Sequence, residues 1–218
     1  YFALVLLPRI REEIQMNRKL TFSVYQALRK ATYKPGAFFK GIVLPLAEDG
    51  ATSWREAMIV GSVVRRASLP VLHSAAALMK LAEMPYTTAS AIFLKFLLDK
   101  KYALPFKTVD AVYSHFVSFT RESRRLPVLW HQCLLVFAQR YKTDLEPEQK
   151  EGMKPLLRAH EHRAITPEVR RELFSSLCRH GAPPVADDLP PDALTDAQRL
   201  ALQIQQQQQQ QHGAMDAD

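Results

Sequence analysis

Hydrophobic residues recur along this chain with the spacing of α-helices. Ile92, Phe93, Phe96 and Leu97 form one apolar stripe, because residues three and four apart share a helix face. Sustained alternation of apolar and polar residues, which marks half-buried strands, is almost absent, and no Asn-Gly hairpin turn occurs. The pattern therefore predicts an all-α protein.

Start signals divide this pattern into about ten helices. Ser53 and Glu56 have the spacing of a capping box, in which each side chain satisfies a free backbone donor of the other residue. Several prolines precede or open apolar runs, where proline loses no helical hydrogen bond. The predicted helices span residues 1–17, 21–33, 36–47, 54–67, 70–84, 88–101, 105–119, 127–143, 146–159 and 167–179.

Two features of the sequence bear on how these helices pack. The predicted helix 127–143 has apolar residues around much of its circumference, which predicts a central position. Gly61 and the alanines at 75–77 leave room for the close approach of a neighbouring helix.

The prolines at the helix starts suggest a repeat. Pro105, Pro127, Pro147 and Pro167 are 22, 20 and 20 residues apart, an interval that one helix and a short turn fill. Two such helices make a unit of about 40 residues, the size of a HEAT or armadillo repeat. We therefore predict an α-solenoid with a HEAT- or armadillo-like helical repeat. Side-chain identity does not repeat cleanly, so a compact, irregular helical bundle is the alternative.

The composition changes near residue 180. We expect one helical-repeat domain over residues 1–180, followed over residues 181–218 by an acidic, glutamine-rich, low-complexity tail. The tail cannot bury enough apolar area to offset its ordering entropy, so it is predicted to be disordered. The sequence begins at Tyr1, already within an apolar helical run, and we expect an N-terminally truncated piece of a longer protein.

Net charge differs between these two parts. The whole chain carries +7, but residues 1–180 hold 28 Lys and Arg against 16 Asp and Glu, and the tail is acidic. A basic body favours an anionic partner, with nucleic acid the leading candidate, although a merely soluble basic protein has the same composition.

Cys133 and Cys178 lie in apolar helical contexts and are expected to be reduced. No apolar run approaches the ~18 residues of a membrane span.

Motifs for catalysis or cofactor binding are weak. His160 and His162 are two residues apart, which does not supply the four ligands of a structural zinc site. The segment GAFFKG at 36–41 has the glycine spacing of a phosphate loop, but Ile and Val follow in place of Lys and Ser or Thr. His131 is close to Cys133 in sequence but does not face it on a helix. We expect no enzyme activity, no cofactor, no metal and no small-molecule substrate.

Basic residues are the remaining signal. Many end predicted helices, where a cation offsets the helix dipole, and this structural role accounts for part of them. Stacked repeats would also align such turns into basic ridges that hold RNA phosphates or acidic protein segments. Arg29 and Lys30 lie near Tyr33 in one such region. The residues that we expect to bind RNA or a partner are Arg9, Arg11, Lys34, Lys40, Arg65, Arg66, Lys100, Lys101, Arg124 and Arg125.

Seven stretches in collinear order resemble the bystin family of eukaryotic small-ribosomal-subunit assembly factors, and LPVLHSAA, LLDKKYALP and LPVLWHQ are the most idiosyncratic parts of them. The glutamine-rich tail does not match the family pattern. The stretches are LVLLPRIREEI (4–14), KPGAFFKGIVLPL (34–46), REAMIVGSVV (55–64), LPVLHSAAALMKLAEMPY (69–86), AIFLKFLLDKKYALPF (91–106), LPVLWHQCLLVFAQRYK (126–142) and ITPEVRREL (165–173).

The resemblance implies an all-α, HEAT-like repeat domain that follows a poorly ordered, charged N-terminal region. It implies a non-catalytic factor that joins the nucleolar precursor of the small subunit, takes part in processing of its rRNA precursor and leaves with the exported pre-40S particle. The implied partners are small-subunit pre-rRNA, ribosomal proteins and other assembly factors near the beak of the subunit. The implied location is the nucleolus and nucleus, with shuttling to the cytoplasm and no membrane association.

The function expected from the sequence is therefore a scaffold on the small-subunit precursor. The alternative is a helical-repeat adaptor that binds proteins alone. Phosphate contacts weaken steeply as salt is raised, whereas a purely protein-binding adaptor would keep its binding.

Overall fold

The computed structural model describes residues 1–187, and within that range the chain is helical with no strand. The predicted disordered tail lies almost wholly outside the described residues. The elements are η1 (Phe2–Leu6), α1 (Leu7–Asn17), α2 (Phe22–Ala31), α3 (Pro35–Phe38), η2 (Phe39–Val43), α4 (Leu44–Glu48), α5 (Trp54–Arg66), α6 (Val71–Glu83), α7 (Thr88–Leu98), α8 (Phe106–Ser118), η3 (Phe119–Arg121), α9 (Val128–Tyr141), α10 (Pro147–Ala159), α11 (Thr166–Phe174) and η4 (Arg179–Gly181).

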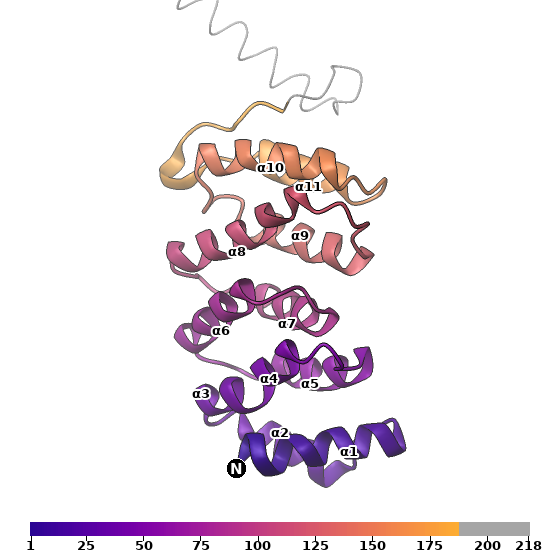
Figure 1. Cartoon of the computed structure of the whole chain (residues 1–218). Helices are drawn as coiled ribbons and strands as arrows, with labels where there is room; N and C mark the ends of the chain where they lie inside the picture. The colour runs from indigo at the N-terminus through magenta and orange to yellow at the C-terminus, as the bar shows by residue number, and fades with distance from the viewer. Residues whose placement is uncertain (188–218) are drawn as a thin grey trace, which may run out of the picture.

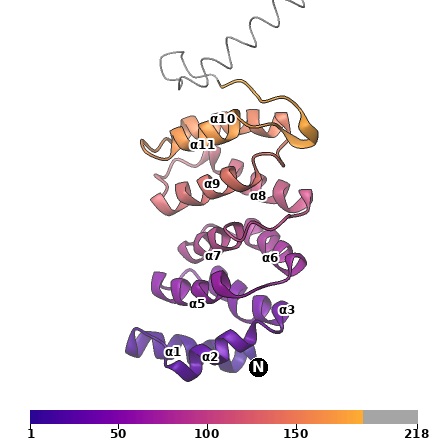
Figure 2. The same ribbon diagram turned by 180° about the vertical axis from the view of Figure 1, so that it is seen from behind.

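The helices stack in two layers along one long axis (Figures 1 and 2). In one layer α5 packs on α7, α7 on α9, and α9 on α11. In the other, α4 packs on α6, α6 on α8, and α8 on α10. Each helix thus contacts mainly its neighbours along the stack, as in repeat proteins. The all-α prediction is confirmed, and the stacking is compatible with the predicted solenoid.

The first predicted helix and the third each contain a π-helical turn. In both, the leucine before a proline donates its N–H to a carbonyl five residues earlier: Leu7 to Phe2, and Leu44 to Phe39. A proline ring clashes with the carbonyl four residues before it in a regular α-helix. The wider π turn accommodates Pro8 and Pro45, so the predicted helix 36–47 consists of α3, η2 and α4 in succession.

The final predicted helix, 167–179, is too long, since α11 ends at Phe174. The reason is tertiary. Lys150 is fully buried in α10, and its Nζ donates to the carbonyl oxygens of Ser176 and Leu177 at 2.8 and 3.1 Å. These carbonyls point at a side chain of another helix, and the backbone leaves the helical path to present them.

The core is continuous from one end of the stack to the other. The helix α9 contributes to this core from several sides, including Trp130, Cys133, Leu134 and Phe137, as its apolar circumference predicted. The Trp130 ring is 1% exposed and lies edge-on to Phe116 and Phe119, each with ring centroids 5.7 Å away. Such edge-to-face contacts add to the hydrophobic stabilisation that area burial gives.

A capping box stabilises one helix start, and ion pairs link elements near the C-terminal end of the described chain. The predicted capping box forms at the start of α5: Ser53 N–H donates to Glu56 Oε2 at 2.7 Å, and Glu56 N–H donates to Ser53 Oγ at 3.2 Å. Near the C-terminal end, Arg179 donates to carboxylates of Asp110 and Glu146, and its guanidinium stacks on Phe106 with 4.3 Å to the ring centroid. These contacts fix the segment after α11 against α8 and α10.

Candidate nucleic-acid interface

A pair of adjacent cations lies in the C-terminal turn of α2, a second pair in that of α5, and a third pair directly after the end of α7. We call this set the basic ridge, and its members are Arg29, Lys30, Arg65, Arg66, Lys100 and Lys101. Five of them are exposed, and Lys100 is half-buried. Long cationic side chains at helix ends keep their charged heads in water while their stems pack on the protein.

Hydrogen bonds between these turns hold them side by side. Lys100 Nζ donates to the carbonyls of Arg65 at 3.3 Å and Ala67 at 2.6 Å, which joins the end of α7 to the end of α5. Arg66 Nη1 donates to the Tyr25 hydroxyl at 3.3 Å, which joins α5 to α2. The three pairs of cations, far apart in the sequence, therefore form one edge of the molecule.

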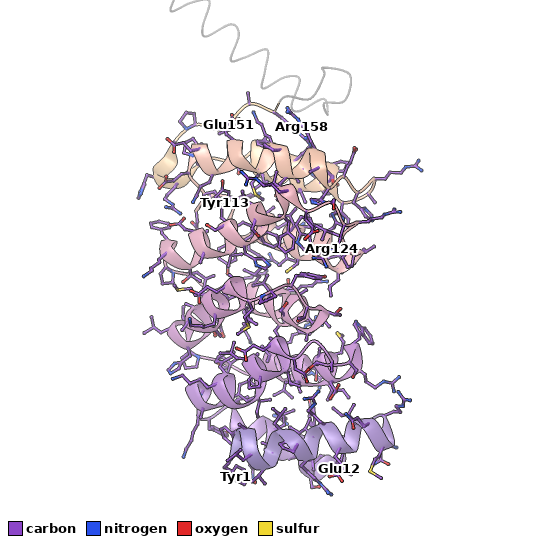
Figure 3. The ribbon with its side chains drawn as sticks, in the orientation of Figure 1. Tyr1, Glu12, Tyr113, Arg124, Glu151 and Arg158 are labelled. Carbon is purple, nitrogen blue, oxygen red and sulfur yellow. The ribbon has the colours of Figure 1, made fainter. Side chains whose placement is uncertain are left out.

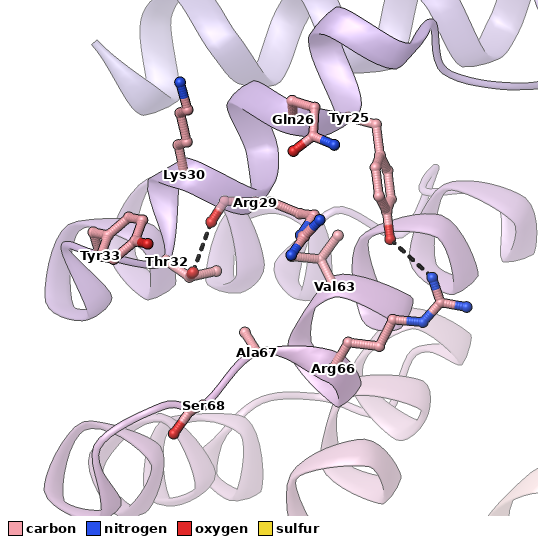
Figure 4. Close-up of a pocket in the computed structure, with 10 residues that line it drawn as sticks. All are labelled: Tyr25, Gln26, Arg29, Lys30, Thr32, Tyr33, Val63, Arg66, Ala67 and Ser68. Atoms are coloured by element: carbon pink, nitrogen blue, oxygen red, sulfur yellow. Dashed lines mark hydrogen bonds between the residues drawn. The ribbon is translucent and has the colours of Figure 1, made fainter.

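A groove of about 590 Å³ lies at the α2–α5 end of the basic ridge, and Figure 4 shows the side chains around it. Its lining includes three cations and two tyrosines but no Asp or Glu. The lining residues are Tyr25, Gln26, Arg29, Lys30, Thr32, Tyr33, Val63, Arg66, Ala67 and Ser68. We call this space the α2–α5 groove. A concave surface with cations and without carboxylates favours an anionic ligand.

The end of α2 does not need Arg29 and Lys30 as hydrogen-bond donors. The last carbonyls of α2 already have partners, because the N–H groups of Thr32 and Tyr33 donate to the carbonyls of Arg29 and Lys30 at 3.2 and 3.1 Å. The Thr32 hydroxyl also donates to the Arg29 carbonyl at 2.7 Å. Within residues 1–187, the side chains of Arg29 and Lys30 make no hydrogen bond or ion pair with the protein, so both cations are available to a ligand.

Two of the ten cations expected from the sequence are internal links. Arg11 donates to Asp49 at 2.6 Å and Glu56 at 3.1 Å, joining α1 to α5. Burial opposes its charge, but hydrogen bonds to Asp49 and Glu56 outweigh that effect and raise the pKa of Arg11. Lys100 is the second link, and burial lowers its pKa. Lys100 therefore positions the basic ridge, and its exposed neighbour Lys101 presents the charge.

Two further candidates are exposed but paired with carboxylates. Arg9 lies 3.6 and 3.4 Å from the carboxylates of Glu12 and Glu13 on its own helix. Arg124 lies 2.9 Å from Glu122, in the loop before α9, and is well above α2 and α5 along the stack (Figures 1 and 3). Arg125, next to Arg124, is exposed. The structure does not bring these residues onto the basic ridge.

Lys34 and Lys40 lie at a second, more open groove, where η1 crosses η2. This groove has a volume of about 670 Å³ and a largely apolar lining made of Tyr1, Phe2, Ala3, Lys34, Ala37, Lys40 and Gly41. The two elements approach closely, because a Cβ on Gly41 would stand 2.8 Å from Cβ of Phe2. An apolar floor with two cations suits a protein segment better than a nucleic acid.

The sequence pattern places Arg29 and Lys30 near Tyr33, but these two cations are not among the ten candidates expected from it. Their position at the end of a predicted helix, directly before a turn, is the signal that could have selected them. The backbone of that turn supplies the hydrogen bonds to the last carbonyls of the helix. The structure brings together Arg65, Arg66, Lys100 and Lys101 of the ten candidates and adds Arg29 and Lys30.

The sequence motifs that were considered for catalysis or cofactor binding lie in helices or in the core. The glycines of GAFFKG lie in α3 and η2, so this segment is helical and does not form a phosphate loop. Cys133 is buried, and burial raises its pKa, which keeps the thiol protonated. Among residues 1–187, no group of three or more His, Cys, Asp or Glu side chains is placed to hold a metal ion.

His131 is buried at the start of α9, with its ring centroid 5.1 Å from that of His162. Burial, together with the neighbouring His162 and His160, lowers the pKa of His131 to about 4. At neutral pH its ring is therefore uncharged.

No helix in the described part of the chain is both long enough and apolar enough to cross a membrane.

A sequence profile of the family described as Bystin matches residues 1–182. A protein named Bystin from Monosiga brevicollis is 56% identical over 187 residues, covering 86% of this chain and 45% of that protein. Proteins of the same name from Rattus norvegicus and Homo sapiens are 56% and 54% identical over 179 residues, covering 82% of this chain and 41% of each. The chain thus spans less than half the length of these relatives.

Proposed function

The chain belongs to the bystin family, and we propose that it acts as a non-catalytic scaffold in assembly of the small ribosomal subunit. In this proposal it binds the small-subunit precursor, supports processing of the rRNA precursor and leaves with the exported pre-40S particle. Its partners would be pre-rRNA, ribosomal proteins and other assembly factors, in the nucleolus and nucleus and then the cytoplasm.

The observation that carries the proposal is the basic ridge. The ends of three helices, α2, α5 and α7, each carry a pair of cations. Hydrogen bonds hold these ends side by side along one edge of the stacked body. RNA presents a regular row of phosphates, so an aligned row of cations binds several of them at once and releases several counterions. Arg29, Lys30, Arg65 and Lys101 are exposed, and their side chains form no ion pair or hydrogen bond within residues 1–187, so they would contribute most to such binding.

A scaffold requires a body that keeps its shape, and the stack has the features of one. Neighbouring layers share a continuous core, and Arg11, Lys100 and Arg179 tie separate elements together with short hydrogen bonds. The groove beside η1, with Lys34 and Lys40, offers a separate place for a protein contact. RNA and protein partners would then meet at two neighbouring grooves, since the adjacent residues Tyr33 and Lys34 line one groove each.

Two triple variants test the RNA contact. Arg29→Gln, Lys30→Gln and Arg66→Gln together remove three charges from the α2–α5 groove. The control combines Arg9→Gln, Arg124→Gln and Arg125→Gln, which changes net charge equally outside the basic ridge. In cells, each tagged protein is crosslinked and the attached RNA is sequenced. Purified proteins are titrated with pre-rRNA fragments at several salt concentrations.

We expect the wild type and the control to recover small-subunit pre-rRNA, and the groove variant to recover much less. The slope of log affinity against log salt should become shallower by about 0.7 to 0.9 for each phosphate that the variant no longer neutralises. If the wild type recovers no pre-rRNA, the direct RNA contact is wrong. Retention of ribosomal proteins in that case would support the protein-binding adaptor.

A further inference from the structure

We propose that the α2–α5 groove receives an unpaired nucleotide of single-stranded RNA, with its base stacked on Tyr33 and its phosphate between Arg29 and Arg66. This inference rests on the proposed RNA contact and specifies the form of RNA that the groove accepts. It follows from an exposed aromatic ring, two unneutralised guanidinium groups and the size of the space between them.

Tyr33 is the aromatic surface of this site. Its side chain is 87% exposed, more than any other large hydrophobic side chain in the described part of the chain. The backbone that carries the ring is fixed, because Tyr33 N–H donates to the Lys30 carbonyl at 3.1 Å and Lys34 N–H donates to the Ala31 carbonyl at 3.1 Å. A ring on a fixed turn, with a free face beside cations, is a platform on which a base stacks.

Arg29 and Arg66 supply the charge. Arg66 is held in place by the Tyr25 hydroxyl, which accepts one of its N–H groups and leaves the others free. Arg29 comes from α2, on the other wall of the groove, and both residues line the same space (Figure 4). A guanidinium presents parallel N–H groups that match two phosphate oxygens, so a pair of them fixes one phosphate firmly.

The size of the groove selects unpaired RNA. Its volume of about 590 Å³ falls within the range of pockets that enclose small ligands, and a single nucleotide fits there. A duplex cannot enter it, and the bases of an A-form helix are stacked inside, where Tyr33 cannot reach them. Within residues 1–187, the Gln26 amide and the Ser68 hydroxyl make no side-chain hydrogen bond, so both can meet a base edge or a 2′-hydroxyl.

The test compares single-stranded and duplex RNA on the full chain. A labelled, unstructured oligoadenosine and a duplex with the same number of phosphates are titrated by fluorescence anisotropy. The variants are Tyr33→Leu, which removes the aromatic face, and Tyr33→Phe, which keeps it. Phe22→Leu is the matched control, because Phe22 is 78% exposed on α2 but does not line the groove. Thermal unfolding shows that each variant is folded.

We expect Tyr33→Leu to weaken binding of oligoadenosine by about five- to a hundredfold, the range that loss of one base–aromatic stack produces. Tyr33→Phe and Phe22→Leu should bind oligoadenosine within about twofold of the wild type. Duplex binding should be the same for all four proteins.

Three results would overturn the inference. If Tyr33→Leu binds oligoadenosine like the wild type while the groove triple variant does not, the groove holds phosphate alone, and the proposed RNA-binding scaffold stands. If Tyr33→Leu weakens duplex and single-stranded RNA equally, the selection for unpaired RNA is wrong. If neither Tyr33→Leu nor the triple variant changes RNA binding, both the stacking site and the RNA contact of the groove fail.

Discussion

Phe96 of α7 lies against the backbone of Gly61 in α5, so close that a Cβ placed on Gly61 would stand 2.6 Å from Cε2 of the ring. The sequence predicted a close approach at Gly61, and the structure confirms it. The two helices are neighbours in the same layer, so this contact sets the spacing of one step of the stack.

Gly61→Ala should therefore destabilise the protein, although alanine favours the helix by about 1 kcal/mol relative to glycine. Overpacking costs about 1–3 kcal/mol, which exceeds that gain when the ring cannot move aside. We expect a net loss of about 1 kcal/mol in the free energy of unfolding, measured by denaturant titration. Gly50→Ala is the control, since nothing lies within 4 Å of a Cβ there.

Adding Phe96→Leu to Gly61→Ala should recover part of the loss, because the smaller side chain gives the new methyl group room. If the double variant is no more stable than the sum of the two single changes predicts, the contact does not limit the spacing of α5 and α7.

Arg11 and Arg9 lie two residues apart on α1, but they should differ in importance. Arg11→Met leaves Glu56, which is 2% exposed, without its cation, and an uncompensated buried charge is costly. We expect a loss of about 2–3 kcal/mol in the free energy of unfolding. Arg9→Met removes only exposed ion pairs, which contribute about 0–1 kcal/mol. Equal losses for the two variants would show that the Arg11 link is not stabilising.

Lys150→Met should destabilise the C-terminal end of the stack. The substitution keeps an unbranched apolar stem, one atom shorter, but leaves the Ser176 and Leu177 carbonyls without their buried donor, at a cost of about 2–4 kcal/mol. Hydrogen exchange should show faster opening around α10 and α11. Lys107→Met, at an exposed position on α8, is the control. A Lys150→Met protein as stable as the wild type would mean that other donors replace the ammonium group.

Stability should fall between neutral and mildly acidic pH, and His131 should account for part of the fall. Its folded pKa of about 4 lies below the unfolded value of about 6.5. The unfolded state therefore binds the proton first as the pH falls below about 6.5, and this difference reaches about 2 kcal/mol at pH 5.

His131→Gln removes this titration. Its free energy of unfolding should fall less than that of the wild type between pH 7 and pH 5, by about 2 kcal/mol. His73→Gln, at an exposed position on α6, should follow the wild type. Parallel pH profiles for wild type and His131→Gln would contradict the assignment.

Much of the helical architecture follows from local sequence. The apolar stripe around Phe93 and Phe96 and the capping box at Ser53 depend on residues within a few positions of each other, so a linear pattern reveals them. The two π turns do not appear in periodicity, because they widen a helix by one residue without breaking it. Their position before Pro8 and Pro45 shows that a local cause exists, although it does not by itself select a π turn over a kink.

The sequence by itself determined the all-α fold, the positions of most helices and the excess of positive charge on the helical body, because backbone preference, amphipathic spacing and composition are local properties. Only the tertiary structure decided which cations lie side by side. Arg11 turns inward because Asp49 and Glu56, some 40 residues away, face it, whereas Arg29 has no such carboxylate beside it in residues 1–187. The role of a cation depends on the charges that folding brings next to it, and a Coulomb interaction acts through distance in space, not through separation along the chain.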